Sequence, residues 1–159
     1  MEKSGLKASD NDIIIEKFKH YADQEGSNGA VLLGVCGGRN SEGEDFPGDY
    51  MNAVAVVGIP FQRPVPSIQA KIEYYDTLFP DKGRDFGYTV PAFQRSNQAC
   101  GRPIRRMNDK GLVVLMDSRF EYYKRFLSGW VRKNIRKIPN RQKLIGREVR
   151  RFFKKFEKK

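Results

Sequence analysis

Apolar residues occur along the chain in two patterns. Three short runs are continuous and rich in valine, and they span residues 30–36, 53–59 and 111–117. Continuous apolar runs of this length are typical of strands that are covered on both faces of a parallel sheet. The sequence therefore predicts three buried strands.

The second pattern is helical. Residues 9–24 repeat apolar side chains at helical spacing, with Ser9 or Asn11 as a candidate N-cap, and residues 63–79 do so after two prolines. The two stripes contain Ile14, Ile15, Phe18 and Tyr21, then Ile68, Ile72, Tyr75 and Leu78. A further helix is expected from about Val90 to the glycine at 101, and residues 79–88 are expected to form a loop.

Helices that alternate with strands predict an α/β fold in which helices flank a parallel sheet. A chain of 159 residues with 39% hydrophobic content is expected to bury one core. The longest apolar run is far shorter than the roughly 18 residues of a membrane span, and the charged N-terminus does not resemble a signal peptide. We therefore expect an intracellular protein, cytoplasmic in a prokaryote or nuclear in a eukaryote, with no membrane partner.

The net charge of +11 is confined to one end of the chain. Residues 132–159 contain thirteen Lys and Arg against Glu148 and Glu157, whereas residues 1–131 carry 17 groups of each sign. A basic segment attracts polyanions such as nucleic acids, although a solvated helix face gives the same pattern. Aromatic residues within and just before this region also allow it to pack on the body or on a partner, and they are Trp130, Phe152, Phe153 and Phe156.

Few residues are available for a metal site or a histidine-based triad. His20 is the only histidine, and the two cysteines, Cys36 and Cys100, have no Cys-x-x-Cys spacing. We expect both thiols to be buried and unpaired and the chain to hold no metal.

Two segments carry candidate chemistry, and each is next to a predicted strand. The loop 37–46, "GGRNSEGEDF", follows the first strand, where α/β folds bind ligands and where glycines let a backbone approach a phosphate. In the segment 98–106, "QACGRPIRR", a helix breaks at glycine and three arginines follow, whose guanidinium groups suit phosphates.

Together, "SEGEDF" and "QACGRPIRR" resemble motifs V and VI of superfamily 2 helicases, specifically the XPD/DinG group of iron–sulfur DNA helicases. The strand that ends in Asp-x-Arg-Phe at 117–120 is also similar to that group. The resemblance spans residues 29–120. It implies the second RecA-like motor domain of an ATP-driven helicase that moves 5′ to 3′ along single-stranded DNA.

The resemblance also implies roles for individual residues. Arg102 and Arg105 would be catalytic, closing over ATP that is bound to the other motor domain. The expected ATP-binding residues are Gln98, Gly101 and Asp45, and the expected DNA-binding residues are Ser41, Glu42, Gly43 and Arg39. Loop capping, or a salt bridge to Arg39 or Arg102, is an alternative explanation for Glu42 and Asp45, and we expect Arg106 to be a solvated charge.

The resembled enzymes need parts that this sequence lacks. It contains no Gly-x-x-x-x-Gly-Lys-[Ser/Thr] and no Asp-Glu pair, so we expect ATP and Mg²⁺ to be bound mainly by a first motor domain outside this chain. An iron–sulfur cluster, which needs four cysteines, is expected only in a full-length protein. The sequence thus reads as a helicase fragment. Its expected partners are single-stranded DNA, the first motor domain, and repair or transcription proteins.

We divide the chain into a motor domain, residues 1–131, and a basic, helical tail, residues 132–159. Two other interpretations remain open: a nucleic-acid-binding module, and a partner-docking module, each without ATPase activity.

Overall fold

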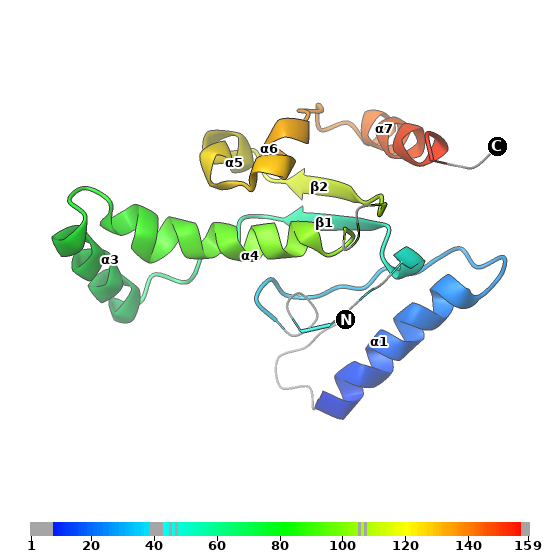
Figure 1. The fold of residues 1–159 in the computed structure, drawn as a ribbon, viewed down its shortest axis with the longest axis horizontal. Coiled ribbons are helices and arrows are strands. Elements are labelled where there is room, and N and C mark those ends of the chain that lie inside the picture. The colour runs from blue at the N-terminus through cyan, green and yellow to red at the C-terminus, as the bar shows by residue number, and fades with distance from the viewer. Residues whose placement is uncertain are drawn as a thin grey trace.

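The centre of the fold is a parallel sheet of two strands. The computed structural model describes residues 8–38, 43, 44, 46, 48–104, 106 and 108–156. Strand β1 (Ala53–Val57) pairs with β2 (Leu112–Met116) in register, from Ala53 opposite Leu112 to Val57 opposite Met116. Between the strands the chain forms α3 (Pro66–Leu78), the π-helical turn η2 (Asp85–Thr89) and α4 (Val90–Gly101), and α4 lies along the sheet (Figure 1).

The remaining elements lie on either side of this unit. Helix α1 (Ala8–Asp23) and the short η1 (Gly48–Tyr50) precede β1, and α5 (Arg119–Tyr122), η3 (Lys124–Phe126) and α6 (Gly129–Asn134) follow β2. Helix α7 (Gln142–Lys154) lies near the C-terminus (Figure 1). None of the helices in the described ranges is both long and apolar enough to cross a bilayer.

The core forms where α4 packs against the sheet and the elements that follow it. Phe93 of α4 is buried, and its ring centroid lies 5.8 Å from that of Phe120 and 5.6 Å from that of Phe126. Burial of a phenylalanine side chain contributes about 1.5–3 kcal/mol, and each aromatic pair adds about 0.5–1.5 kcal/mol. The buried members of this cluster are Val56, Ile59, Ala92, Phe93, Ala99, Cys100, Phe120, Leu127 and Val131.

The sequence predicted a strand that does not form. Residues 30–35 pair with neither β1 nor β2, and Val31, Leu33 and Val35 are exposed, Val31 by 85%. A run of valines becomes a strand only where another strand can accept its hydrogen bonds, and neither described strand does so here. The prediction that the strands are covered on both faces was also wrong, because Val57 of β1 is 77% exposed.

The helices were predicted more accurately. The three expected helices correspond to α1, α3 and α4, and the helical tail contains α7. The expected loop 79–88 is wrong from residue 83 onward, because a helical turn at 83–84 and η2 extend α4 toward the N-terminus. The Val90 N–H donates to the carbonyl of Asp85 across a widened turn, and Pro91, which has no N–H, follows it directly.

Two glycines allow η2 to approach α3 closely. A Cβ atom at Gly87 would lie 2.9 Å from the backbone nitrogen and 3.0 Å from the Cα of Ile72. A Cβ atom at Gly83, just before η2, would overlap the backbone carbonyl oxygen of Ile72. The N–H of Gly83 donates to the Asp76 carboxylate over 2.6 Å. Contacts this short with backbone atoms leave no room for a side chain.

We therefore expect Gly87→Ala to lower the free energy of unfolding by about 1–3 kcal/mol, since the added methyl must push η2 away from α3. Gly129→Ala is the matched control, because a Cβ at that helical glycine meets nothing within 4 Å. Urea denaturation of the two variants and the unchanged protein measures both effects. Equal stability of all three proteins would contradict the close packing of η2 on α3.

Candidate functional site

The two segments singled out in the sequence meet at Arg102. This residue follows the last residue of α4, and only 8% of it is exposed. Its Nη1 donates a hydrogen bond to the backbone carbonyl of Glu44, 58 residues earlier in the chain. A buried guanidinium is stable only when its N–H groups are hydrogen-bonded, so this contact draws the loop around Glu44 to the end of α4.

Helix α1 holds the same loop from the other side. Phe46 is 1% exposed and packs edge-on against Phe18, with 5.7 Å between the ring centroids. Lys19 lies over the Phe46 ring at 5.4 Å, and its Nζ is 4.0 Å from the Glu44 carboxylate. Glu44 and Phe46 are thus held between α1 and the end of α4. The helical spacing of Phe18 was visible in the sequence, but its partner was not.

Four of the predicted site residues are described. Gln98 is exposed on α4, Gly101 ends that helix, Gly43 is exposed in a turn, and Arg102 is buried as described above. Arg106 is exposed, as expected for a solvated charge. Arg39, Ser41, Glu42, Asp45 and Arg105 lie outside the described residues. Their placement and roles therefore stay predictions.

The polar face of α4 lines a hollow and also carries side chains that bind other segments of the chain. Pro91, Gln94 and Gln98 line a shallow hollow on this face together with two further residues, Arg95 and Asn97. These two also reach outward: Arg95 donates to the carbonyl of Pro60 at 3.3 Å, and Asn97 donates to that of Phe126 at 3.0 Å. The Asn97 side-chain oxygen accepts the N–H of Ser128 at 2.9 Å. Sequence reasoning missed both residues, because their partners are distant in the chain.

Asp117 joins the carboxyl ends of the two strands. Its carboxylate accepts hydrogen bonds from the Arg119 side chain at 2.6–3.1 Å and from the Arg119 N–H at 2.9 Å. The bonds from Arg119, together with one from the Ile59 N–H, lower the pKa of Asp117 to about 2. Gly58, with φ of +78°, makes the turn that brings Ile59 into place.

The chain does not fit an iron–sulfur cluster. Such a cluster needs four thiolates, and the sequence has two cysteines. Cys100 is fully buried, which raises the pKa of its thiol to about 11 and disfavours the thiolate that binds metal. Within the described residues no group of three His, Cys, Asp or Glu side chains could hold a metal ion.

The low pKa of Asp117 predicts how stability depends on pH. Because the folded-state pKa lies below the usual value of 3.8, the carboxylate stabilises the fold above about pH 4, and this contribution is lost as the pH falls toward 2. We expect Asp117→Asn to be less stable at pH 7 and the difference from the unchanged protein to shrink near pH 2. Denaturation curves at both pH values, with Asp81→Asn as an exposed control, measure this. A difference that stays constant with pH would contradict the assignment.

Comparison with known proteins places these features in a family. A family model described as "Helicase C-terminal domain" matches residues 1–134. The regulator of telomere elongation helicase 1 of Rattus norvegicus is 34% identical over 158 residues, covering 91% of this chain and 12% of that protein. A homologue from Drosophila persimilis is 37% identical over 154 residues, covering 90% of this chain and 15% of that protein.

A second kind of relative gives the same result. The Fanconi anemia group J protein homolog of Gallus gallus is 34% identical over 149 residues, covering 87% of this chain and 12% of that protein. The chain thus spans about an eighth of the length of these relatives. It belongs to the helicase C-terminal domain family, as the second RecA-like motor domain of the XPD/DinG group of superfamily 2 helicases.

Proposed function

We propose that this chain works as part of an ATP-dependent, 5′-to-3′ DNA helicase that acts in DNA repair. It supplies the arginines that close over ATP and part of the track for single-stranded DNA. The observation that carries this proposal is the hydrogen bond from the Arg102 guanidinium to the Glu44 carbonyl. Through it, the end of α4 and the loop that precedes β1 form one unit.

ATP bound to the first motor domain would contact the end of α4. Gln98 and Gly101 lie in the last turn of α4, and with Asp45 they would position the nucleotide. The role of Arg105 would be to place its guanidinium against charge that develops on the γ-phosphate in the transition state. Arg102 would share in this closure, and its bond to Glu44 would transmit a shift of α4 to the loop. Bound Mg²⁺ would neutralise phosphate charge, with its ligands supplied by the first domain.

DNA would meet the same unit on the loop. Ser41, Glu42, Gly43 and Arg39 would contact the strand, with the Ser41 hydroxyl and nearby N–H groups directed at a phosphate. Because Arg102 and Phe46 fix the loop on two sides, a movement at the ATP end would displace the DNA contacts as well. Coupling of this kind is what a motor needs to convert hydrolysis into movement along a strand.

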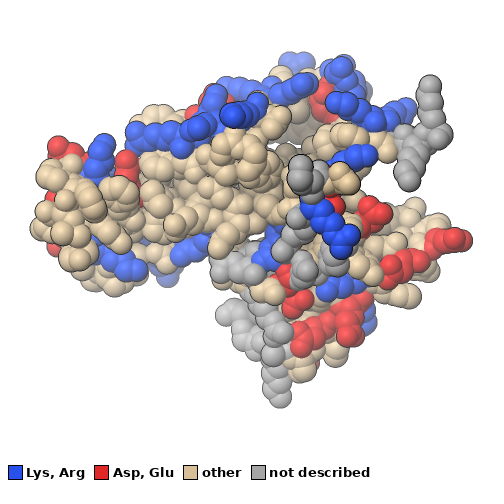
Figure 2. Space-filling view, viewed as in Figure 1, with Lys and Arg blue, Asp and Glu red and all other residues tan. Residues whose placement is uncertain are grey.

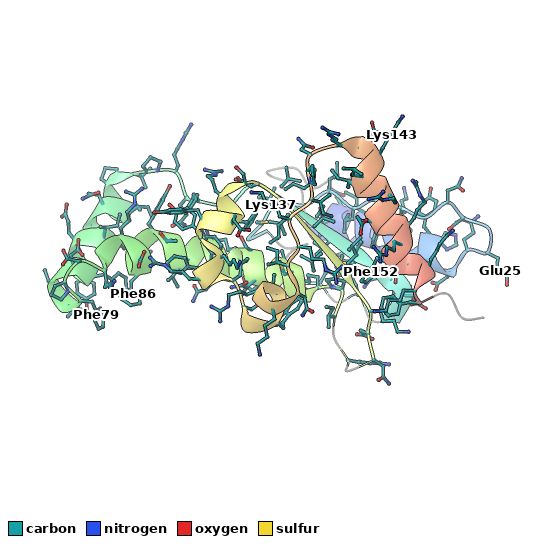
Figure 3. All side chains as sticks on the ribbon, turned by 90° about the horizontal axis from the view of Figure 1, so that it is seen from above. Glu25, Phe79, Phe86, Lys137, Lys143 and Phe152 are labelled. Carbon is teal, nitrogen blue, oxygen red and sulfur yellow. The ribbon has the colours of Figure 1, made fainter. Side chains whose placement is uncertain are left out.

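A second candidate function rests on α7. Its polar face is almost entirely basic, whereas Glu148 is its only acidic residue. Lys and Arg side chains gather along the edge of the molecule that α7 occupies, and Asp and Glu gather around α1 (Figure 2). Lys143 lies near the start of α7 and Phe152 near its end (Figure 3). This helix would suit a nucleic-acid-binding or partner-docking module without ATPase activity.

The test of the helicase proposal uses the full-length protein. Arg105→Ala should lower kcat for ATP hydrolysis by about 10³–10⁵-fold with little change in ATP affinity, because the Arg105 guanidinium would act mainly in the transition state. Arg106→Ala is the matched control, since its side chain is exposed and has no assigned role. Steady-state ATPase assays with and without single-stranded DNA measure both. Near-normal kcat in Arg105→Ala would contradict the role given to Arg105, whereas no ATP hydrolysis by the unchanged full-length protein would contradict the helicase proposal and favour the binding-module alternative.

A further inference from the structure

A ladder of aromatic rings and guanidinium groups stands at the carboxyl edge of the sheet. Phe61, just after β1, stacks on Tyr88 of η2 with 4.9 Å between ring centroids and 7° between the ring planes. Arg84 lies over the Tyr88 ring at 5.5 Å, and Arg119 lies over the Phe61 ring at 5.8 Å. The order of contacts is therefore guanidinium, ring, ring, guanidinium.

The turn that carries Phe61 is fixed before any ligand arrives. The Ile59 N–H donates to Asp117, the Phe61 N–H donates to the Ile59 carbonyl at 2.7 Å, and the Pro60 carbonyl accepts from Arg95 at 3.3 Å. Tyr123 adds an edge-on contact to the Phe61 ring at 5.9 Å. A platform held in this way loses little conformational freedom when something stacks on it.

The two ends of the ladder differ. Arg119 is held by several hydrogen bonds to Asp117, so it is fixed behind Phe61. Arg84 is exposed on the helical turn before η2, and Arg63 is exposed near the Phe61 turn. These two side chains can turn toward a phosphate without breaking any contact that holds the Phe61 turn.

We propose that this ladder is a stacking site for the bases of single-stranded DNA. A base takes the place of the Arg84 guanidinium on the Tyr88 ring, and Arg84 and Arg63 turn to the adjoining phosphates. Aromatic rings beside cationic side chains are the combination that single-strand-binding proteins use, since every base has a π-face. The inference rests on the proposed function, and it adds a site to the loop residues assigned there.

The test measures binding of the whole chain to a labelled 20-nucleotide oligothymidine and to an abasic strand of equal length. The unchanged protein should bind the oligothymidine about tenfold more tightly, because only that strand has bases to stack. Tyr88→Leu should lose this preference while the dependence on salt stays the same, since no phosphate contact is removed. Tyr88→Phe, which keeps the ring, is the matched control and should behave as the unchanged protein does.

Ultraviolet cross-linking gives a readout that needs no variant. A strand with bromodeoxyuridine, bound to the unchanged protein, should cross-link to Tyr88 or Phe61. Retention of the base preference in Tyr88→Leu, or cross-links only to tail aromatics such as Phe152, would overturn the stacking site alone. Failure of the unchanged protein to bind either strand at low salt would contradict the proposed function as well.

Discussion

A charge that cannot be buried alone organises this molecule. The Arg102 guanidinium lies at the end of α4 with little access to water, and its hydrogen bond to Glu44 satisfies part of its demand for acceptors. The loop around Glu44 must therefore come to α4, and it is kept there by the burial of Phe46 against α1. The position of the guanidinium depends in turn on a fixed α4, and the burial of Phe93 in the core fixes that helix.

Helix α4 holds three separate segments through one polar face. Arg102 binds the carbonyl of Glu44 before β1, Arg95 binds that of Pro60 after β1, and Asn97 binds the backbone at Phe126 and Ser128 after β2. Hydrogen bonds to backbone groups fix position without depending on the partner's side chain. The opposite face of α4 supplies core residues, so packing on one side makes the three contacts on the other precise.

The sequence predicted most of the helices and strands. Helical spacing of apolar residues predicted α1 and α3, continuous apolar runs predicted β1 and β2, and a further helix was expected from about Val90 to Gly101, where α4 forms. Two motifs indicated that the loop 37–46 and the end of α4 carry functional residues. The valine run 30–36 misled, since whether a strand forms depends on a neighbour that no local pattern reveals.

The sequence could not show the contacts of α4. Arg95, Asn97 and Arg102 bind groups 35, 29 and 58 residues away, and nothing local marks the partner of such a bond. The π-helical turn η2 was also hidden, because "DFGYT" shows no helical repeat and a proline follows within two residues. The close fit of Gly83 and Gly87 against α3 is likewise a property of two elements together.

Amide hydrogen exchange, followed residue by residue in NMR spectra, tests most directly whether α4 fixes the loops. Arg102→Lys keeps the charge but loses the guanidinium fork, and it should raise exchange at Glu44 and Phe46 while leaving Phe61 unchanged. Arg95→Lys should give the reverse pattern, with faster exchange at Phe61 alone. If exchange at Glu44 and Phe46 were the same in Arg102→Lys as in the unchanged protein, α4 would not be the element that positions the loop.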